Sequence, residues 1–307
     1  SLNYASKAWA TIAIDMKFPF QISRYPKLHA GFTLVEMVIV IVIIGIIAGV
    51  LALFVGSPVL GFLAQERRAA LTDEADLVLL RLSRELRTAL PGSVRGSNSV
   101  VEFLATLDGE RYRAEPPGLS DDRLETGTDD SAFNTITRLG GAAGIPAGAR
   151  LAVYPLGLPG SDPYNAADGV MTPASISFNQ GAVDVDGRSE SRITFTSASG
   201  VATHNFPRDS PSRRVFLVEG PVSYLCDGTR LLRYAGYAPQ SAQPASRAQL
   251  DALATPIQIN EKISNCNFSF AGSGAARRNA VVSIALTLQD DQETVRLFRQ
   301  VHYNNTP

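Results

Sequence analysis

Gly31-Phe32-Thr33-Leu34-Val35-Glu36 is followed by residues 37–55, MVIVIVIIGIIAGVLALFV, a run without a polar side chain. At a rise of about 1.5 Å per residue, residues 37–55 form a helix of about 28 Å, long enough to cross a bilayer. An ionised carboxylate near lipid costs about 2.5–3.5 kcal/mol on insertion scales. A segment selected only for anchoring would carry an apolar residue at position 36. The sequence therefore predicts a membrane-spanning helix in which Glu36 has a role of its own.

The apolar run differs from a secretory signal peptide, because it exceeds the roughly 7–15 residues of such a core and no Ala-x-Ala site follows it. The candidate cleavage point lies before the run, at Gly31, after a polar stretch that carries Arg24, Lys27 and His29. Met16 is a plausible start, which would make residues 16–31 a short basic leader and place residues 1–15 upstream. We expect residues 1–31 to be removed and residues 32–57 to span the membrane.

A basic leader, a glycine, a phenylalanine, an acid at a fixed offset and an apolar helix together resemble the processing signal of type IV prepilins and type II secretion pseudopilins. The resemblance implies that a prepilin peptidase cuts after Gly31 and methylates Phe32, which makes Glu36 the fifth residue of the mature chain. It also implies a single-pass inner-membrane protein with a periplasmic head before assembly, and a pilus or pseudopilus subunit afterwards. The implied partners are other pilin or pseudopilin subunits, the peptidase and the membrane, with no cofactor.

A narrower resemblance is to the MshO-type minor pilins, which serve the biogenesis of the MSHA (mannose-sensitive haemagglutinin) pilus and themselves resemble J-type minor pseudopilins. It is carried by residues 57–62, 67–69, 86–95, 215–228 and 281–303. The function it implies is that of a structural subunit that helps to initiate or cap an MSHA-type pilus. In major pilins a helix-breaking proline falls earlier than Pro58 does here, so we expect any helix break at a different place.

After the apolar run the pattern becomes amphipathic. Apolar residues recur at spacings of three and four, namely Leu71, Ala75, Val78, Leu82, Leu86 and Ala89, while Asp73, Glu74, Asp76, Arg81, Arg84 and Arg87 occupy the other side. We expect residues 58–91 to continue the helix against a globular head, and Pro91-Gly92 to end it. Burial of this apolar face would contribute about 10 kcal/mol before conformational entropy is counted.

Cleavage after Gly31 would leave a positively charged amine on Phe32. Since an unpaired ion is strongly penalised in a low dielectric, a carboxylate would gain by pairing with that amine. We hypothesise that Glu36 recruits the chain into a fibre by pairing with the Phe32 amine of a neighbouring subunit. Pairing with Phe32 of the same chain is the alternative.

Residues 92–307 are expected to form a β-rich periplasmic head, because short alternating runs bounded by Gly, Asp, Asn and Pro follow residue 95. Residues 139–169 and 237–244 resemble loops. Asp227-Gly228 predicts one hairpin, and the polar turn at 289–291 predicts a second. The predicted strands are 100–106, 151–154, 192–196, 214–218, 222–226, 230–234, 281–288 and 294–301. The predicted class is α+β and pilin-like: a long N-terminal helix, first transmembrane and then amphipathic, packed on an antiparallel sheet.

The chain has two cysteines, Cys226 and Cys266, and no Cys-x-x-Cys or clustered histidine accompanies them. Because zinc sites use about four ligands, a disulfide is favoured, with two buried thiols as the alternative. Such a bridge would close a loop of about 40 residues and contribute about 4 kcal/mol in the chain-entropy model. It would also fit an exported domain.

Other candidate chemistry is sparse. The segment around Asp184, Asp186 and Glu190 has alternate oxygens that could reach calcium, but it lacks most of an EF-hand loop, and a strand-connecting turn explains it better. The histidines are scattered, and no nucleophile elbow or phosphate loop is present, so we do not expect an enzyme. The net charge is −1, so the doublets Arg67-Arg68, Arg213-Arg214 and Arg277-Arg278 are expected on solvated faces and no nucleic-acid partner is predicted.

Three other functions remain open. The chain could be a J-type minor pseudopilin of type II secretion, or a binding module displayed at a pilus tip. Tyr154, Tyr164 and Tyr237, expected to be exposed in loops, would permit binding without arguing for it. An enzyme tethered by a simple membrane helix is less favoured because of Glu36.

Overall fold

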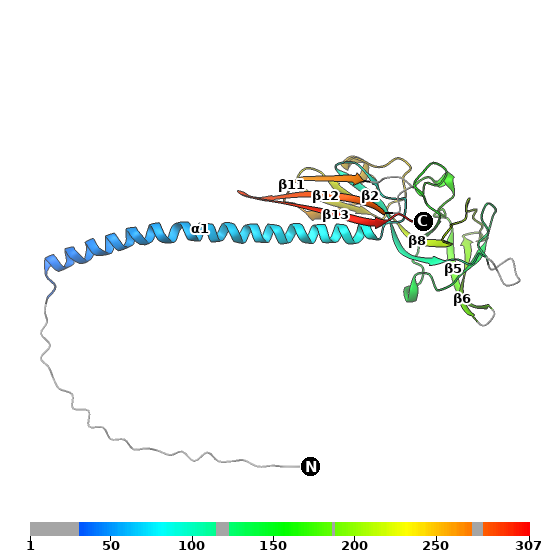
Figure 1. Ribbon diagram of the computed structural model, residues 1–307, viewed down its shortest axis with the longest axis horizontal. Helices are drawn as coiled ribbons and strands as arrows, with labels where there is room; N and C mark the ends of the chain where they lie inside the picture. Colours follow the sequence, from blue (N-terminus) through cyan, green and yellow to red (C-terminus); the bar gives the residue numbers. More distant parts are fainter. Residues whose placement is uncertain (1–30, 115–122, 186–187, 272–278) are drawn as a thin grey trace, which may run out of the picture. The chain divides into compact units, whose positions relative to one another are not determined.

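The computed structural model describes residues 31–114, 123–185, 188–271 and 279–307 (Figure 1). The chain divides into two compact units, Ser1–Val59 and Leu60–Pro307. An apolar N-terminal helix followed by antiparallel sheets confirms the predicted α+β class. The predicted leader before Gly31, including Met16, lies outside the described residues.

Helix α1 (Leu34–Arg87) remains helical through Pro58. It ends before Pro91, where the sequence predicted its end, because the following residues already pair with strand β2 (Val100–Arg111). The Leu90 N–H donates to the Leu104 carbonyl at 2.8 Å, and the Thr106 N–H donates to the Thr88 carbonyl at 2.9 Å. Strand-like pairing therefore replaces the last expected turn of the helix.

The main sheet has six antiparallel strands, with β8 (Arg214–Cys226) at its centre. One edge of β8 pairs with β2 along its length, and β1 (Arg95–Gly96) extends the sheet beyond β2. The other edge pairs first with β4 (Arg150–Val153) and then with β9 (Leu231–Ala235), which is followed by β10 (Ile257–Asn260). The β8–β9 hairpin confirms the prediction made from Asp227-Gly228.

The sequence predicted two strands, 214–218 and 222–226, where the structure has the single strand β8. Gly220 and Pro221 interrupt the apolar pattern, and Gly220 adopts a φ of +149°, a value that favours glycine. The pairing nevertheless continues, with Pro221 opposite Leu104. The register shifts twice here, once at Glu219 of β8 and once at Leu107 of β2, and the ladder then continues. The other edge of β8 can therefore pair with both β4 and β9.

Two smaller antiparallel sheets complete the head. One is formed by β11 (Ile263–Ala271), β12 (Asn279–Asp290) and β13 (Glu293–Asn304), and its β12–β13 hairpin was predicted. The other contains β3 (Ala132–Thr135), β6 (Arg188–Ser197), β5 (Ser177–Val185) and β7 (Gly200–Val201). Short helices lie between strands: α2 (Arg247–Asp251) and the 3-10 turns Gly141–Ala143 and Ala166–Asp168.

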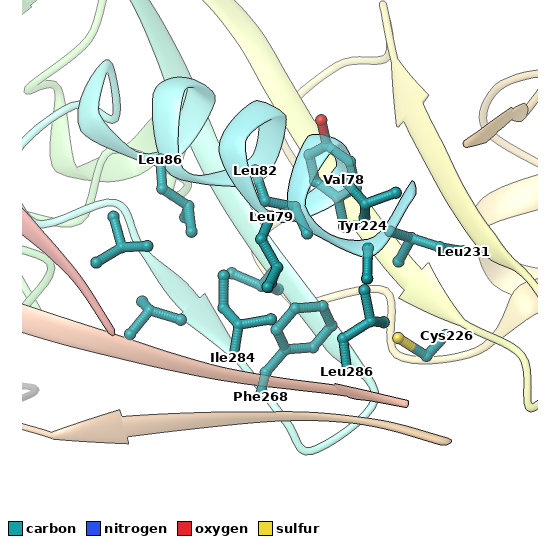
Figure 2. Packing of buried hydrophobic residues seen from close by; sticks show 14 of the residues in the cluster. Val78, Leu79, Leu82, Leu86, Tyr224, Cys226, Leu231, Phe268, Ile284 and Leu286 are labelled. Atoms are coloured by element: carbon teal, nitrogen blue, oxygen red, sulfur yellow. The ribbon is translucent and has the colours of Figure 1, made fainter. Parts of the chain in front are cut away.

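The core that holds α1 on the head contains the predicted helix face. All six residues of the predicted apolar face are buried, five of them in α1 and the sixth, Ala89, in the strand-like segment just after it, and Leu79 of α1 joins them. They pack against side chains of the main sheet and of the β11–β13 sheet, as Figure 2 shows for Tyr224, Phe268 and Ile284. The amphipathic prediction for this half of the helix is confirmed.

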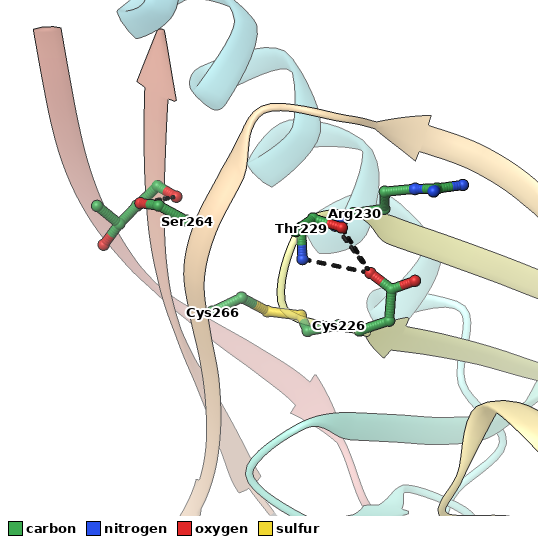
Figure 3. The surroundings of a disulfide bond; sticks show 7 residues. Cys226, Thr229, Arg230, Ser264 and Cys266 are labelled. Atoms are coloured by element: carbon green, nitrogen blue, oxygen red, sulfur yellow. Dashed lines mark hydrogen bonds between the residues drawn. A yellow bond between two sulfur atoms is a disulfide. The ribbon is translucent and has the colours of Figure 1, made fainter. Parts of the chain in front are cut away.

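A disulfide joins Cys226 at the end of β8 to Cys266 in β11, with Cα atoms 6.1 Å apart and a sequence separation of 40 (Figure 3). It confirms the pairing that the sequence favoured. The bond connects the main sheet to the three-stranded sheet, which also meet where the Phe268 N–H donates to the Asn98 carbonyl at 2.9 Å. The disulfide therefore holds together the two sheets against which α1 packs.

We predict that Leu82→Ala lowers the free energy of unfolding by about 2–5 kcal/mol, because Leu82 is 1% exposed and its truncation leaves a cavity in the core. Leu77→Ala is the matched control, since Leu77 lies on the same helix and is 67% exposed. Urea denaturation of the detergent-solubilised full chain measures both. Equal effects of the two variants would show that this face of α1 does not pack as described.

We predict that Cys226→Ser combined with Cys266→Ser lowers the free energy of unfolding by about 4 kcal/mol, because the reduced unfolded chain gains conformational freedom. Denaturation of the wild-type chain with and without a reducing agent is the control and should show the same shift. An unchanged midpoint in the double variant would contradict the stabilising role of this bond.

Candidate assembly site in the N-terminal helix

The start of α1 is set by Thr33. Its Oγ1 accepts a hydrogen bond from the Glu36 N–H at 3.2 Å, and its carbonyl accepts one from the Met37 N–H at 3.2 Å. Thr33 followed three residues later by Glu36 is the sequence pattern of a capping box. Gly31 and Phe32 precede the helix in an irregular segment, and Phe32 is 78% exposed. The peptide bond between Gly31 and Phe32 therefore lies in non-helical, accessible chain.

The first part of α1 is apolar and makes no core. Leu34–Ala52 is long enough to cross a membrane, has a mean hydropathy of 3.1 and is 0% buried. Large apolar side chains point outward on every side of this segment, including Leu34, Ile41, Ile46 and Leu51. A helix that is apolar all round belongs in lipid or among other apolar helices. This segment fits a membrane anchor.

Glu36 is exposed, and within the described ranges its carboxylate has no hydrogen bond and no ion pair. In a full capping box this side chain would accept a bond from the backbone N–H of the capping residue. Here Thr33 supplies its half of the motif, while the reciprocal bond is absent among the described contacts. Helix capping therefore accounts for the Glu36 N–H but leaves its charge unexplained.

The second half of α1 differs because its charged residues have partners in the head. Arg67 and Arg68, expected on a solvated face, remain exposed but contact Asp291 at 3.2 Å and Glu293 at 2.8 Å. Further along, Arg299 contacts Asp76 at 2.9 Å, and the Arg233 Nε donates to Glu85 at 2.8 Å. Exposed pairs contribute little individually. These ion pairs join the second half of α1 to the head on both sides of its buried apolar face.

Two of the three loop tyrosines that the sequence predicted to be exposed are buried. The Tyr164 hydroxyl donates to the Ser93 carbonyl at 3.0 Å, and the Arg95 guanidinium stacks 3.5 Å from the ring centroid. The Tyr237 hydroxyl donates to Glu102 at 2.9 Å. Burial raises the pKa of both phenols. The prediction is wrong because each hydroxyl meets an acceptor inside the head: the Tyr164 hydroxyl satisfies the Ser93 carbonyl, and the Tyr237 hydroxyl satisfies the buried Glu102 carboxylate.

The described residues of the calcium candidate lie in different environments. Glu190 is buried and forms an ion pair with Arg113, and it also accepts a bond from Asn134 Nδ2 at 3.1 Å. Asp184 lies exposed on β5, opposite Ser189 of β6, and Asp186 lies outside the described residues. The hairpin pairing agrees with the strand-connecting turn that the sequence favoured. The strand-connecting turn stays the favoured interpretation and calcium binding the weaker one, and the Glu190 carboxylate is bound to Arg113 and Asn134.

The histidines do not form a described cluster with other potential ligands, since no group of three His, Cys, Asp or Glu side chains arises among the placed residues. The His204 ring lies 4.5 Å from Phe206, and its Nε2 lies 2.9 Å from the Gly169 carbonyl oxygen. Burial lowers the pKa of His204. These contacts are those of a packed residue. His302 lies exposed on β13, and His29 is outside the described residues.

Comparison with known protein families gives a match at the N-terminal segment. Residues 26–52 match the family model described as the prokaryotic N-terminal methylation motif. Searches of curated proteins and of solved structures found no match. The matched residues contain Gly31, Phe32, Glu36 and the whole span Leu34–Ala52. The N-terminal segment of the chain therefore carries a type IV prepilin-like motif.

Proposed function

We propose that this chain is a minor pilin-like structural subunit that helps to initiate or cap an MSHA-type type IV pilus. Prepilin peptidase would cut after Gly31 and methylate Phe32. The observation that carries the proposal is Glu36, a carboxylate without a described partner at the start of a fully exposed apolar helix. An anchor alone would not need that charge.

The charge becomes useful once the helix is among other helices. In a low dielectric an isolated carboxylate is penalised, while a paired one with satisfied hydrogen bonds is tolerated. Cleavage after Gly31 creates the required cation at Phe32, close to the carboxylate in sequence. Because Glu36 has no counter-ion in the described chain, the amine of a neighbouring processed subunit is the partner we favour. The amine of its own Phe32 is the alternative.

The head fits exposure to the periplasm. Its disulfide between Cys226 and Cys266 is a bond of oxidising compartments. We therefore place the protein in the inner membrane, as a single-pass subunit with a periplasmic head, before it enters a fibre. The apolar half of α1 would contribute to the helical bundle of that fibre, and the head would be displayed on it.

The assignment to an MSHA-type pilus rests on the resemblance of residues 57–62, 86–95 and 215–228 to MshO-type proteins. A J-type pseudopilin of type II secretion is the alternative within the same class. A tip-displayed adhesive module is the alternative of another class. Deletion of the gene separates them: lost pili indicate assembly, lost secretion indicates a pseudopilus, and intact pili with lost adhesion indicate binding.

We predict that Glu36→Gln lowers incorporation of the subunit into its fibre or tip complex by more than about tenfold, because glutamine cannot neutralise a partner amine. Glutamine preserves the size of the side chain and its capacity to cap the helix. Quantitative immunoblotting of sheared fibres against the membrane fraction measures incorporation.

Thr33→Ala is the control, since it removes the described helix cap and leaves the charge in place. We expect this variant to enter the fibre at close to wild-type level. Wild-type incorporation of Glu36→Gln would eliminate the recruiting role, and a loss confined to Thr33→Ala would assign the motif to helix capping instead.

A further inference from the structure

A cavity of about 540 Å³ lies in the head where the end of β2 meets the start of β6. Tyr112 turns inward, with its ring edge-to-face with Phe133 at a centroid distance of 6.5 Å. Its neighbours on either side in the chain, Arg111 and Arg113, both line the cavity. Arg213 reaches it from the segment before β8, which is antiparallel to β2 and places Arg214 opposite Arg111.

The charges around this cavity do not balance. Arg113 is paired with the buried Glu190, so one of the three guanidinium groups is neutralised within the chain. Arg111 and Arg213 have no ion pair or side-chain hydrogen bond with any residue that the structure places. Among the described lining residues, three guanidinium groups against one carboxylate leave a net charge of +2. The nearby Asp209 carboxylate accepts a hydrogen bond from the Tyr112 hydroxyl. Two arginines are therefore available to an external anion.

Arg213 is held in a conformation that its own side chain disfavours. It has a φ of +53°, in the left-handed region that glycine or asparagine adopts more easily. Local bonds fix it there: the Arg213 N–H donates to the Ser210 carbonyl at 2.8 Å, and the Tyr112 N–H donates to the Arg213 carbonyl at 2.9 Å. Ser210 is held in turn by the Tyr112 hydroxyl, which accepts its N–H at 2.9 Å. Strain of this kind is characteristic of functional positions.

The remaining lining suits a small organic molecule. Ser189 and Ser212 offer hydroxyl groups, while Ala114 and the half-exposed Ile136 offer apolar surface. The cavity volume lies within the roughly 300–1,000 Å³ of ligand pockets. Arginine forks match the two oxygens of a carboxylate or phosphate in a planar geometry.

From the unpaired arginines, the strained backbone and the cavity, we propose that this site binds the oxyanion of a sugar-sized ligand. Arg111 and Arg213 hold the carboxylate or phosphate group, and the serine hydroxyls and Ile136 contact the body of the ligand. The site lies on the head, in a different part of the chain from the N-terminal motif. Its existence does not depend on the proposed assembly role.

Calorimetric titration of the detergent-solubilised full chain with glucuronate, glucose 6-phosphate and glucose tests the proposal. We expect at least one charged sugar to bind and glucose to bind more than about tenfold more weakly, because it lacks the ionic group. Binding of glucuronate alone identifies a carboxylate site, and binding of glucose 6-phosphate alone identifies a phosphate site. Charged sugars that bind no better than glucose would overturn the proposal.

Variants of the arginines locate the binding. Arg111→Gln should weaken the binding of the charged sugar by about tenfold or more. Arg230→Gln should leave this affinity unchanged, because Arg230 lies exposed beyond the opposite end of β8. Arg213→Gly should abolish binding and raise the melting temperature, because glycine relieves the strained φ. Equal losses of affinity in Arg111→Gln and Arg230→Gln would show that general surface charge attracts the sugar, which would contradict the proposed site.

Discussion

One unbalanced charge, that of Glu36, underlies the proposed role of this protein. Glu36 stands at the start of an apolar segment that is 0% buried, and no described side chain neutralises it. Both features are unfavourable for an isolated chain, because the apolar surface needs a non-aqueous environment and the carboxylate needs a cation within it. An assembly of processed helices, as proposed above, would supply both at once. The exposed apolar residues and the unpaired acid then have the same explanation.

The two halves of α1 differ in what their apolar side chains contact. After Leu60 the helix buries its apolar face against two sheets, and its flanking charges find partners such as Asp291 and Glu293. The disulfide between Cys226 and Cys266 joins those two sheets beneath the helix. Before Val59 no comparable partner is described. The described stabilising contacts of α1 therefore lie in its second half, after Leu60. The apolar side chains of its first half have no such contacts within the described chain and are available to lipid or to other helices.

Patterns of neighbouring residues correctly predicted the buried helix face and two hairpins. The spacing of Leu71, Val78 and Leu82 gave the buried face of α1, and the turns at Asp227-Gly228 and 289–291 gave two hairpins. Strands β5 and β11 were missed because polar residues interrupt their alternation. The length of β8 was missed because pairing with β2 overrides the interruption at Gly220 and Pro221. Long-range pairing, which no local pattern encodes, decided these cases.

The same reason explains why the arginine cavity escaped prediction. Arg213-Arg214 has the pattern of a solvated doublet, and only the register of β2 against β8 brings Arg213 near Arg111 and Arg113. The N-terminal motif, in contrast, is contiguous and could be identified from sequence alone. Mass spectrometry of the mature protein extracted from membranes would show whether Glu36 lies next to a processed N-terminus. We expect a chain that begins at Phe32 and carries one added methyl group, whereas an intact leader or any other N-terminus would contradict the proposed role of Glu36.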